Sequence, residues 1–282
     1  MSESKQELGL TPLAGVVGKY GLDARKALGQ HFLLDETLCA RIALLPGDLT
    51  GRHVLEVGPG PGGLTRALLG KPLAHLTAVE LDERAIAALA EVVAAHPGRL
   101  TVLRQDAMKF DGVAQLPAPR QVVANLPYNV GTPLLIGWLR EAASWERLTL
   151  MFQEEVAFRI TAAPQTEHYG RLAVLAQWVA DCMVGLRLPP GAFRPPPRVH
   201  SAVVVITPHA EQPPPELFRA MERVTAAAFG QRRKMLRGSL KSLGGAEALL
   251  EQCGIAGERR AEELPVSAFD ALARAVLARG GA

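Results

Sequence analysis

The feature that most constrains the fold is a regular alternation of short apolar runs with longer helix-like segments between about residues 35 and 160. The apolar runs are predicted strands at His53–Val57, Leu76–Glu80, Leu100–Arg104, Gln121–Ala124 and Leu148–Phe152. The predicted helices between them are Leu64–Leu69, Glu83–Ala95 and Thr132–Ala143. This alternation indicates βαβ units, and therefore a parallel sheet with helices on both faces. A later apolar run, Ser201–Thr207, predicts one more strand.

A change of pattern after residue 210 predicts a second domain. The run Pro208–Pro215 contains consecutive prolines, which stiffen a chain and stop helices, so it is the best candidate for a linker. Only helices are predicted beyond it, at Phe218–Leu243 (one or two helices), Ala246–Cys253 and Ala268–Arg279, with Ser267 as the N-cap of the last. We therefore predict an α/β Rossmann-like domain at residues 1–210 and a small all-helical domain at residues 211–282.

Composition narrows the class of protein. The chain has 282 residues, of which 48% are hydrophobic, so a sizeable core is possible. Three cysteines lie far apart and seven histidines are scattered, which favours neither a disulfide framework nor a metal site. The start of the chain is polar, and every long apolar stretch contains polar or charged residues. We predict a cytoplasmic protein without a metal ion or a membrane partner.

A glycine-rich loop and two acids predict a nucleotide site. The loop "EVGPGPGG" follows the first strand, and its Gly58, Gly60 and Gly63 allow a tight turn and the close approach of a ligand. Glu80 ends the second strand and can accept hydrogen bonds from ribose hydroxyls. Asp106 follows the third strand, where it can accept from an adenine amino group. These positions are at the carboxyl ends of parallel strands, where ligands of open α/β sheets bind. A dinucleotide site, an S-adenosylmethionine site and a turn without a ligand all fit this pattern.

Several motifs in order resemble one family, the ribosomal RNA adenine dimethyltransferases of the KsgA type. They are "GQHFLLD", "EVGPGPGGLT", "VELD", "QDA", "NLPYN", "EHYGRLAVLAQ", "AFRPPPRVHSAVV" and "FGQRRKMLRGSL", and together they extend over nearly the whole chain. The resemblance implies a Rossmann-like methyltransferase domain and S-adenosylmethionine as the cofactor. By the same resemblance, the targets are two adjacent adenosines near the 3′ end of 16S rRNA in the assembling small subunit.

The segment "NLPY" after the fourth strand has a chemical use in such an enzyme. The N6 amine of adenine is a poor nucleophile because its lone pair is delocalised into the ring. The side-chain oxygen of Asn125 and the carbonyl of Leu126, which Pro127 restricts, can accept hydrogen bonds from both N6 protons and turn the lone pair toward the methyl donor. Tyr128 can stack on a base that has left its helix. Positioning and electrostatics then suffice for a direct in-line transfer. The alternative is a strand that ends in an Asn-capped proline turn.

Three further expectations come from the resemblance alone. A segment at about residues 20–36 would fold over the cofactor, with His31 and Leu33 at its methionine end, although relatives generally have Asn where this chain has His31. Phe193 matches an aromatic residue that would sandwich the target base opposite Tyr128, and the alternative is a core phenylalanine. His200 stands where relatives usually have Asp.

A basic cluster predicts how the chain reaches RNA. Its members are Arg232, Arg233, Lys234, Arg237 and Lys241, and no acid occurs between Glu222 and Glu247. The spacing of Arg233, Arg237 and Lys241 would place them on one face of a helix, which suits contacts with phosphates. The alternative is a solvated helix face. Phosphate contacts do not read sequence, so the choice of target would come from the shape of the RNA.

Three other functions stay open on the sequence. One is methylation of an adenine in large-subunit rRNA, whose enzymes share motifs like "NLPY". The second is a non-catalytic ribosome assembly factor that keeps the fold, against which the presence of Glu80, Asp106 and Asn125 argues. The third is a dinucleotide oxidoreductase. The sequence implies no protein partner.

Overall fold

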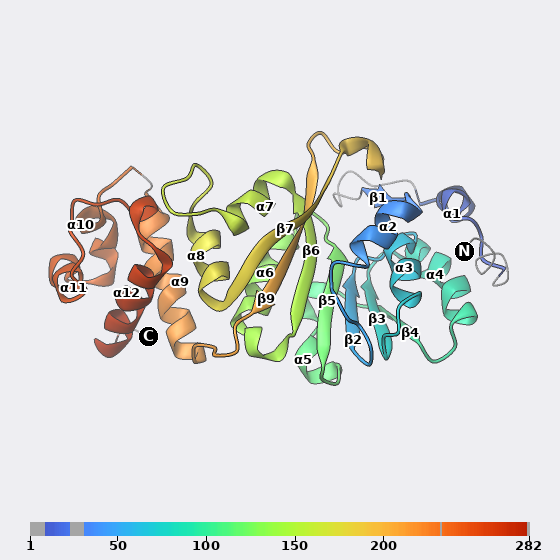
Figure 1. Cartoon of the computed structure of the whole chain (residues 1–282), viewed down its shortest axis with the longest axis horizontal. Helices are drawn as coiled ribbons and strands as arrows, with labels where there is room; N and C mark the ends of the chain where they lie inside the picture. The colour runs from blue at the N-terminus through green and yellow to red at the C-terminus, as the bar shows by residue number, and fades with distance from the viewer. Residues whose placement is uncertain (1–8, 23–30, 232, 281–282) are drawn as a thin grey trace. The chain divides into compact units, whose positions relative to one another are not determined.

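A seven-stranded sheet forms the centre of the computed structural model, which describes residues 9–22, 31–231 and 233–280 (Figure 1). The strand order is β4-β3-β2-β5-β6-β9-β7. The strands are β2 (His53–Val57), β3 (His75–Glu80), β4 (Leu100–Arg104), β5 (Arg120–Asn125), β6 (Arg147–Gln153), β7 (Ala180–Leu188) and β9 (Ser201–Pro208). The first five strands of this order pair in parallel. The chain winds outward from β2 to β4 and then returns to β5 beside β2, so a topological switch point lies between β2 and β5.

Helices pack against the part of the sheet that holds the predicted nucleotide site. Helix α3 (Gly63–Leu69) packs against β3 and against α2 (Glu36–Ile42), and α4 (Glu83–Ala95) packs against β3 and β4. Fully buried Val54, Leu76 and Leu89 belong to the core between these layers. The other helices up to residue 161 are α1 (Leu13–Lys19), α5 (Gly112–Gln115), α6 (Gly131–Arg140) and α7 (Glu154–Thr161). A separate two-stranded sheet pairs β1 (Phe32–Leu33) with β8 (Phe193–Arg194) in antiparallel fashion.

The predicted α/β architecture is confirmed. Strands β2 and β4 and helix α4 coincide with their predicted ranges, and the other predicted strands differ by one residue at one or both ends. Strand β7 was not predicted. It follows α8 (Arg171–Val179) directly, and no glycine or proline marks the change from helix to strand.

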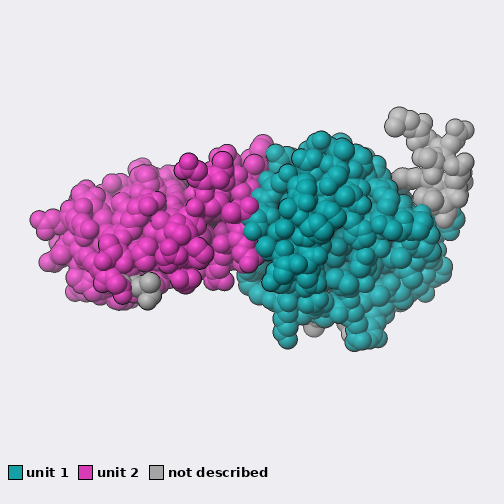
Figure 2. Space-filling model, turned by 90° about the horizontal axis from the view of Figure 1, so that it is seen from below, with its two compact units in different colours: residues 1–135, 144–157, 184–205 teal, residues 136–143, 158–183, 206–282 magenta. Residues whose placement is uncertain are grey.

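The described chain divides into two compact units (Figure 2). The first contains residues 1–135, 144–157 and 184–205, and the second contains residues 136–143, 158–183 and 206–282. The division therefore does not follow one cut in the sequence, and the predicted domain boundary at residue 210 stays a prediction. None of the described helices is long and apolar enough to cross a membrane.

The second unit is built from helices and the contacts among them. After α8 these are α9 (Pro215–Phe229), α10 (Leu236–Ser239), α11 (Ala246–Gln252) and α12 (Val266–Ala278). The Tyr169 hydroxyl donates to the Leu264 carbonyl at 2.9 Å, and the Trp178 indole donates to Asp270 at 3.1 Å. The rings of Phe229 and Phe269 stack with centroids 5.4 Å apart. These contacts tie the helices after residue 210 to α8 and the turn before it.

The predicted start of the last helix was wrong. Helix α12 begins at Val266 with Pro265 as its N-cap, so Ser267 lies inside the first turn and provides no side-chain cap. The fixed φ of proline suits the start of a helix, where the backbone N–H that proline lacks has no partner within the helix. The helix can therefore start at Val266, two residues before the predicted Ala268. Asp270, further along the helix, forms an ion pair with Arg274 at 2.8 Å.

Candidate active site

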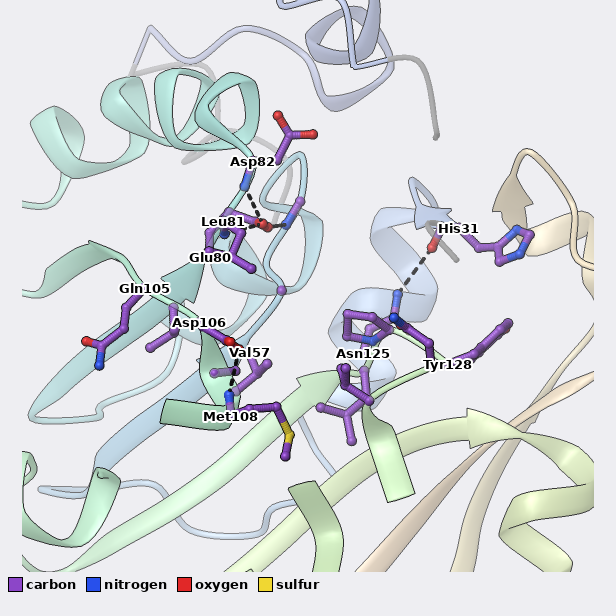
Figure 3. A pocket seen from close by; sticks show the side chains of 18 of the residues that line it. His31, Val57, Glu80, Leu81, Asp82, Gln105, Asp106, Met108, Asn125 and Tyr128 are labelled. Carbon is purple, nitrogen blue, oxygen red and sulfur yellow. Dashed lines mark hydrogen bonds between the residues drawn. The ribbon is translucent and has the colours of Figure 1, made fainter. Parts of the chain in front are cut away.

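A pocket lies at the carboxyl ends of β2, β3, β4 and β5 (Figure 3). Four segments after these strands line it, together with His31 and Phe32. The lining segments are Val57, Gly58 and Gly60 at the end of β2, Val79–Asp82 at the end of β3, Gln105–Met108 after β4, and Asn125–Val130 at the end of β5. The structure thus brings together the glycine loop, both predicted acids and the "NLPY" segment. Because the pocket opens at the switch point of the sheet, its position is the one that parallel α/β folds use for ligands.

Two glycines of the loop are required by close neighbours. Gly58 and Gly60 have φ values of +66° and +52°, which side chains rarely adopt. A Cβ on Gly58 would lie 3.3 Å from a ring carbon of Pro127, and one on Gly60 would lie 3.0 Å from the ring of Phe32. The glycines therefore let the "NLPY" segment and β1 pack directly on the loop.

Backbone N–H groups hold the carboxylate of Glu80. One oxygen accepts from the amides of Leu81 and Asp82 at 2.7 and 2.9 Å, and the other accepts from the amide of Gly60 at 3.3 Å. Burial raises the pKa of Glu80 above its ordinary value, which these hydrogen bonds oppose. The side chain is therefore fixed at the end of β3, next to the glycine loop, as its predicted contact with a ribose requires.

A second acid, Glu56, lies behind the loop and outside the pocket. It is buried on β2, and its Oε2 has no hydrogen-bond partner among the described residues. Burial, with a smaller contribution from the nearby charge of Glu80, raises the pKa of Glu56 to about 8. This carboxyl is therefore largely protonated at neutral pH, and sequence reasoning assigned it no role.

Asp106 and two apolar residues line the end of the pocket that lies away from Tyr128 (Figure 3). Asp106 caps the turn after β4, where one of its oxygens accepts from the Met108 amide at 2.9 Å. Leu81 and Met108 also line the pocket, although their side chains are 60% and 49% exposed. Exposed apolar side chains beside an acid suit a flat ring that carries an amino group. Sequence reasoning missed Leu81 and Met108, and their signal was their position just after the two predicted acids.

Asn125 and Tyr128 occupy the opposite end of the pocket. The Asn125 amide nitrogen donates to the His31 carbonyl at 3.4 Å, which leaves its side-chain oxygen as an acceptor. The hydroxyl groups of Tyr128 and Ser201 form a hydrogen bond of 2.8 Å, and Ser201 is buried at the start of β9. Burial raises the pKa of Tyr128, so the phenol stays neutral. Sequence reasoning missed Ser201, whose signal was a hydroxyl at the first position of an apolar run.

The segment between these two residues is held by packing and by a helix start. The side chain of Leu126 is buried, and the carbonyl of Pro127 accepts from the amides of Val130 and Gly131 at 3.1 Å, where α6 begins. The turn at the end of β5 is therefore held firmly in place. A purely structural proline turn, the alternative given by the sequence, would be held in the same way.

Two predicted site residues lie in the hydrophobic core. Phe193 is 0% exposed and Leu33 is buried, they pair with each other in the β1–β8 sheet, and neither lines the pocket. The prediction that Phe193 sandwiches the target base does not fit this arrangement, because its ring already packs against core side chains. A contact of Leu33 with the cofactor stays a prediction.

The basic cluster does not lie on one face of a single helix, so that prediction was wrong. Helix α9 ends at Phe229, Arg233 lies in the turn that follows, and Arg237 belongs to the separate helix α10. The backbone leaves the helix because the amides of Leu236 and Arg237 donate to carbonyls of Arg259 and Gly257. The described members of the cluster are all exposed: Arg233, Lys234, Arg237 and Lys241. Arg232 lies outside the described residues.

Comparison with known proteins agrees with the geometry of the pocket. A family model described as ribosomal RNA adenine dimethylase matches residues 21–276. The chain belongs to this family. A ribosomal RNA small subunit methyltransferase A of Gluconobacter oxydans is 64% identical over 272 residues, which are 96% of this chain and 89% of that protein. The protein of the same name from Paramagnetospirillum magneticum is 56% identical over 96% of each chain.

Solved structures show the same fold. A dimethyladenosine transferase from Plasmodium falciparum matches with a TM-score of 0.73 and 22% identity, covering 86% of this chain and 96% of that one. The 23S rRNA methyltransferase ErmE matches with a TM-score of 0.66 and 25% identity, covering 87% and 99%. Membership of the dimethylase family confirms the predicted fold class and the predicted enzyme, an S-adenosylmethionine-dependent rRNA adenine dimethyltransferase. The oxidoreductase alternative is thereby set aside.

The residues of the pocket fit S-adenosylmethionine. Glu80 suits its ribose, Asp106 with Leu81 and Met108 suits its adenine, and the cradle at Gly58 has no room for a side chain. Which of these residues touch the cofactor stays a prediction.

Proposed function

We propose that this protein dimethylates N6 of two adjacent adenosines near the 3′ end of 16S rRNA, within the assembling small subunit in the cytoplasm. Two relatives at 64% and 56% identity are named small subunit methyltransferases, which favours the small subunit over the large one. The likeness to ErmE, a 23S rRNA methyltransferase, makes large-subunit RNA the second candidate.

The arrangement of the pocket is the observation that supports this function best. Figure 3 places Asn125 between Glu80 and Asp106 on one side and the rings of His31 and Tyr128 on the other. We call the side of the pocket with Glu80 and Asp106 the cofactor half, and the side with His31 and Tyr128 the target half. A methyl donor in the first half and a base in the second would meet at Asn125.

In the proposed mechanism the chain positions the amine and leaves its lone pair free. S-adenosylmethionine, when bound, supplies an electrophilic methyl group. The Asn125 oxygen and the Leu126 carbonyl accept hydrogen bonds from the two N6 hydrogens, which turns the lone pair toward the cofactor half. Tyr128, fixed by Ser201, stacks on the base and holds it away from its RNA helix. The N6–methyl bond would form as the sulfonium–methyl bond breaks, and the methylated N6 would then lose one proton to solvent. No side chain needs to form a covalent bond, because positioning and electrostatics lower the barrier.

The basic cluster is proposed to bind phosphates of the RNA. Arg233, Lys234, Arg237 and Lys241 are all exposed. A guanidinium nitrogen of Arg237 lies 3.1 Å from a carboxylate oxygen of Glu258, which offsets part of the charge of Arg237. When the logarithm of the binding constant is plotted against the logarithm of the salt concentration, removal of one phosphate contact reduces the slope by roughly one unit. We expect the double substitution Arg233→Ala with Lys234→Ala to weaken subunit binding and reduce that slope. Arg219→Ala, at an exposed position of α9, should leave both nearly unchanged.

One experiment tests the activity directly. The protein is incubated with a labelled methyl donor and with undermodified small or large subunits, and the labelled nucleoside is mapped. The proposal expects N6,N6-dimethyladenosine at two adjacent positions of 16S rRNA and no label in large subunits. Label in 23S rRNA instead would favour the second candidate, and no label with either subunit would favour a non-catalytic assembly factor.

A further inference from the structure

His31 contacts the target half through its imidazole ring. The ring centroids of His31 and Tyr128 are 5.4 Å apart, with the ring planes tilted by 33°. Figure 3 shows both rings on the side of Asn125 that faces away from Glu80 and Asp106. The ring of this residue therefore lies with the stacking aromatic and not with the acids of the cofactor half.

A hydrogen bond fixes the imidazole in one tautomer. Nδ1 of His31 lies 2.9 Å from the carbonyl of Pro195. A carbonyl can only accept, so Nδ1 must carry the proton and the neutral ring keeps its lone pair on Nε2. Pro195 follows β8, which pairs with β1 through Phe32 and Arg194. The ring is thus held between the "RPPPR" loop and Tyr128.

The main chain of the same residue reaches Asn125. The His31 carbonyl accepts from the Asn125 amide nitrogen at 3.4 Å, so it determines which end of the amide remains available. The next residue, Phe32, packs its ring on Gly60 of the glycine loop. Residue 31 is therefore anchored on the cofactor half while its side chain points into the target half.

We propose that His31 is a positioning residue for the target adenosine, which holds the Tyr128 ring through its imidazole and orients the Asn125 amide through its carbonyl. This inference rests on the proposed function, because it assigns the way in which the target base is received. It also replaces the expectation that the side chain of residue 31 contacts the methionine end of the cofactor.

The two contacts can be separated by substitution. His31→Ala removes the ring and its hydrogen bond but keeps the carbonyl on Asn125. His31→Phe keeps an aromatic ring beside Tyr128 but loses the donor to Pro195. An aromatic pair contributes an amount that corresponds to roughly threefold to tenfold in rate or affinity.

The test measures methylation of undermodified small subunits and, by calorimetry, the affinity for S-adenosylmethionine. We expect His31→Ala to lower kcat/KM for the subunit roughly threefold to tenfold and to change the cofactor affinity less than twofold. His31→Phe should recover most of the loss. In a Tyr128→Ala background, His31→Ala should have little further effect, because the group through which it acts is absent.

Two outcomes would overturn this inference. An equal loss of cofactor affinity and of kcat/KM in His31→Ala would place the ring in the cofactor half. Full additivity with Tyr128→Ala would show that the two rings act independently. If either result is obtained while the wild-type protein labels small subunits, only the role of His31 is contradicted. If the wild-type protein labels no subunit, the proposed function is contradicted as well.

Discussion

The two halves of the pocket are built in different ways. In the cofactor half, Glu80 and Asp106 accept hydrogen bonds mainly from amides one or two residues further along the chain, with one longer-range contact between Glu80 and the Gly60 amide. In the target half, Tyr128 is held by Ser201, which is 73 residues away in the sequence, and contacts the ring of His31, which directly precedes β1. One half is fixed mainly by local turns and the other by long-range side-chain contacts.

This difference predicts how each half responds to mutation. An acid held by its own turn keeps its place when distant residues change, so substitutions there should act on cofactor affinity. An aromatic ring held from two sides by distant residues depends on all of them. Substitutions in the target half should therefore act on the rate with RNA and leave cofactor affinity unchanged.

The largest expected effect is at Asn125, where the halves meet. Asn125→Ala removes an acceptor that is used at the reacting amine, and loss of one such group costs roughly 10²–10³-fold in kcat. Single-turnover methylation of small subunits measures it, and thermal unfolding verifies that the fold is retained. A rate within tenfold of the wild type would remove Asn125 from the reaction.

The next effect is expected in the cofactor half. Glu80→Ala should weaken S-adenosylmethionine binding by roughly tenfold to a hundredfold, since hydrogen bonds to a charged group contribute about 1.5–3 kcal/mol. Calorimetric titration gives the affinity. Glu83→Ala is the matched control, because Glu83 is an exposed acid three residues later that pairs with Arg104. Similar losses in both variants would show a general effect of charge.

A smaller effect tests the target half. Tyr128→Phe and Ser201→Ala each remove the same hydrogen bond, which is worth about 0.5–1.5 kcal/mol, so each should slow methylation only severalfold. The double variant should be no slower than the slower single variant, because the bond can be lost only once. Additive losses, measured as kcat/KM for small subunits, would contradict this view of Tyr128.

The last expected effect concerns stability, not activity, and involves the buried acid behind the cofactor half. Glu56 has a pKa of about 8 in the fold and an ordinary value near 4.5 when unfolded. Between these values the unfolded chain releases the proton and the folded chain keeps it, so the free energy of unfolding falls as pH rises, by about 1.4 kcal/mol per unit at most. Urea unfolding at pH 5 and pH 7.5 should show this fall in the wild type and a shallower one in Glu56→Gln. Parallel profiles would mean that Glu56 does not titrate in this range.

Much of the fold could be predicted because its elements are marked locally. Strand β2 ends in a glycine loop, and α4 begins after Asp82, whose side chain caps it. The sequence has no such mark between α8 and β7, where Val179 and Ala180 are both apolar, so the strand was missed. The basic cluster was placed on one helix because spacing alone cannot show that loop carbonyls at residues 257 and 259 would bind its amides.

The site divides in the same way as the fold. The residues of the cofactor half follow the ends of predicted strands, so parallel topology alone brings them together. The contacts of Tyr128 with Ser201 and His31 depend on how β9 and β1 approach β5, which no local pattern encodes. Phe193 was assigned to the base from the family resemblance alone, and its burial follows from the pairing of β8 with β1, which no local pattern encodes either.

The central claim is that cofactor and target adenine meet at Asn125 from opposite halves of one pocket. A crystal structure with a bisubstrate analogue, in which the N6 of adenosine is joined through a short linker to the cofactor skeleton, tests it most directly. We predict that the adenosine lies on Tyr128 with N6 within hydrogen-bond distance of the Asn125 oxygen, and that the cofactor ribose lies on Glu80. An adenosine bound anywhere else, with Tyr128 uncovered, would contradict the claim.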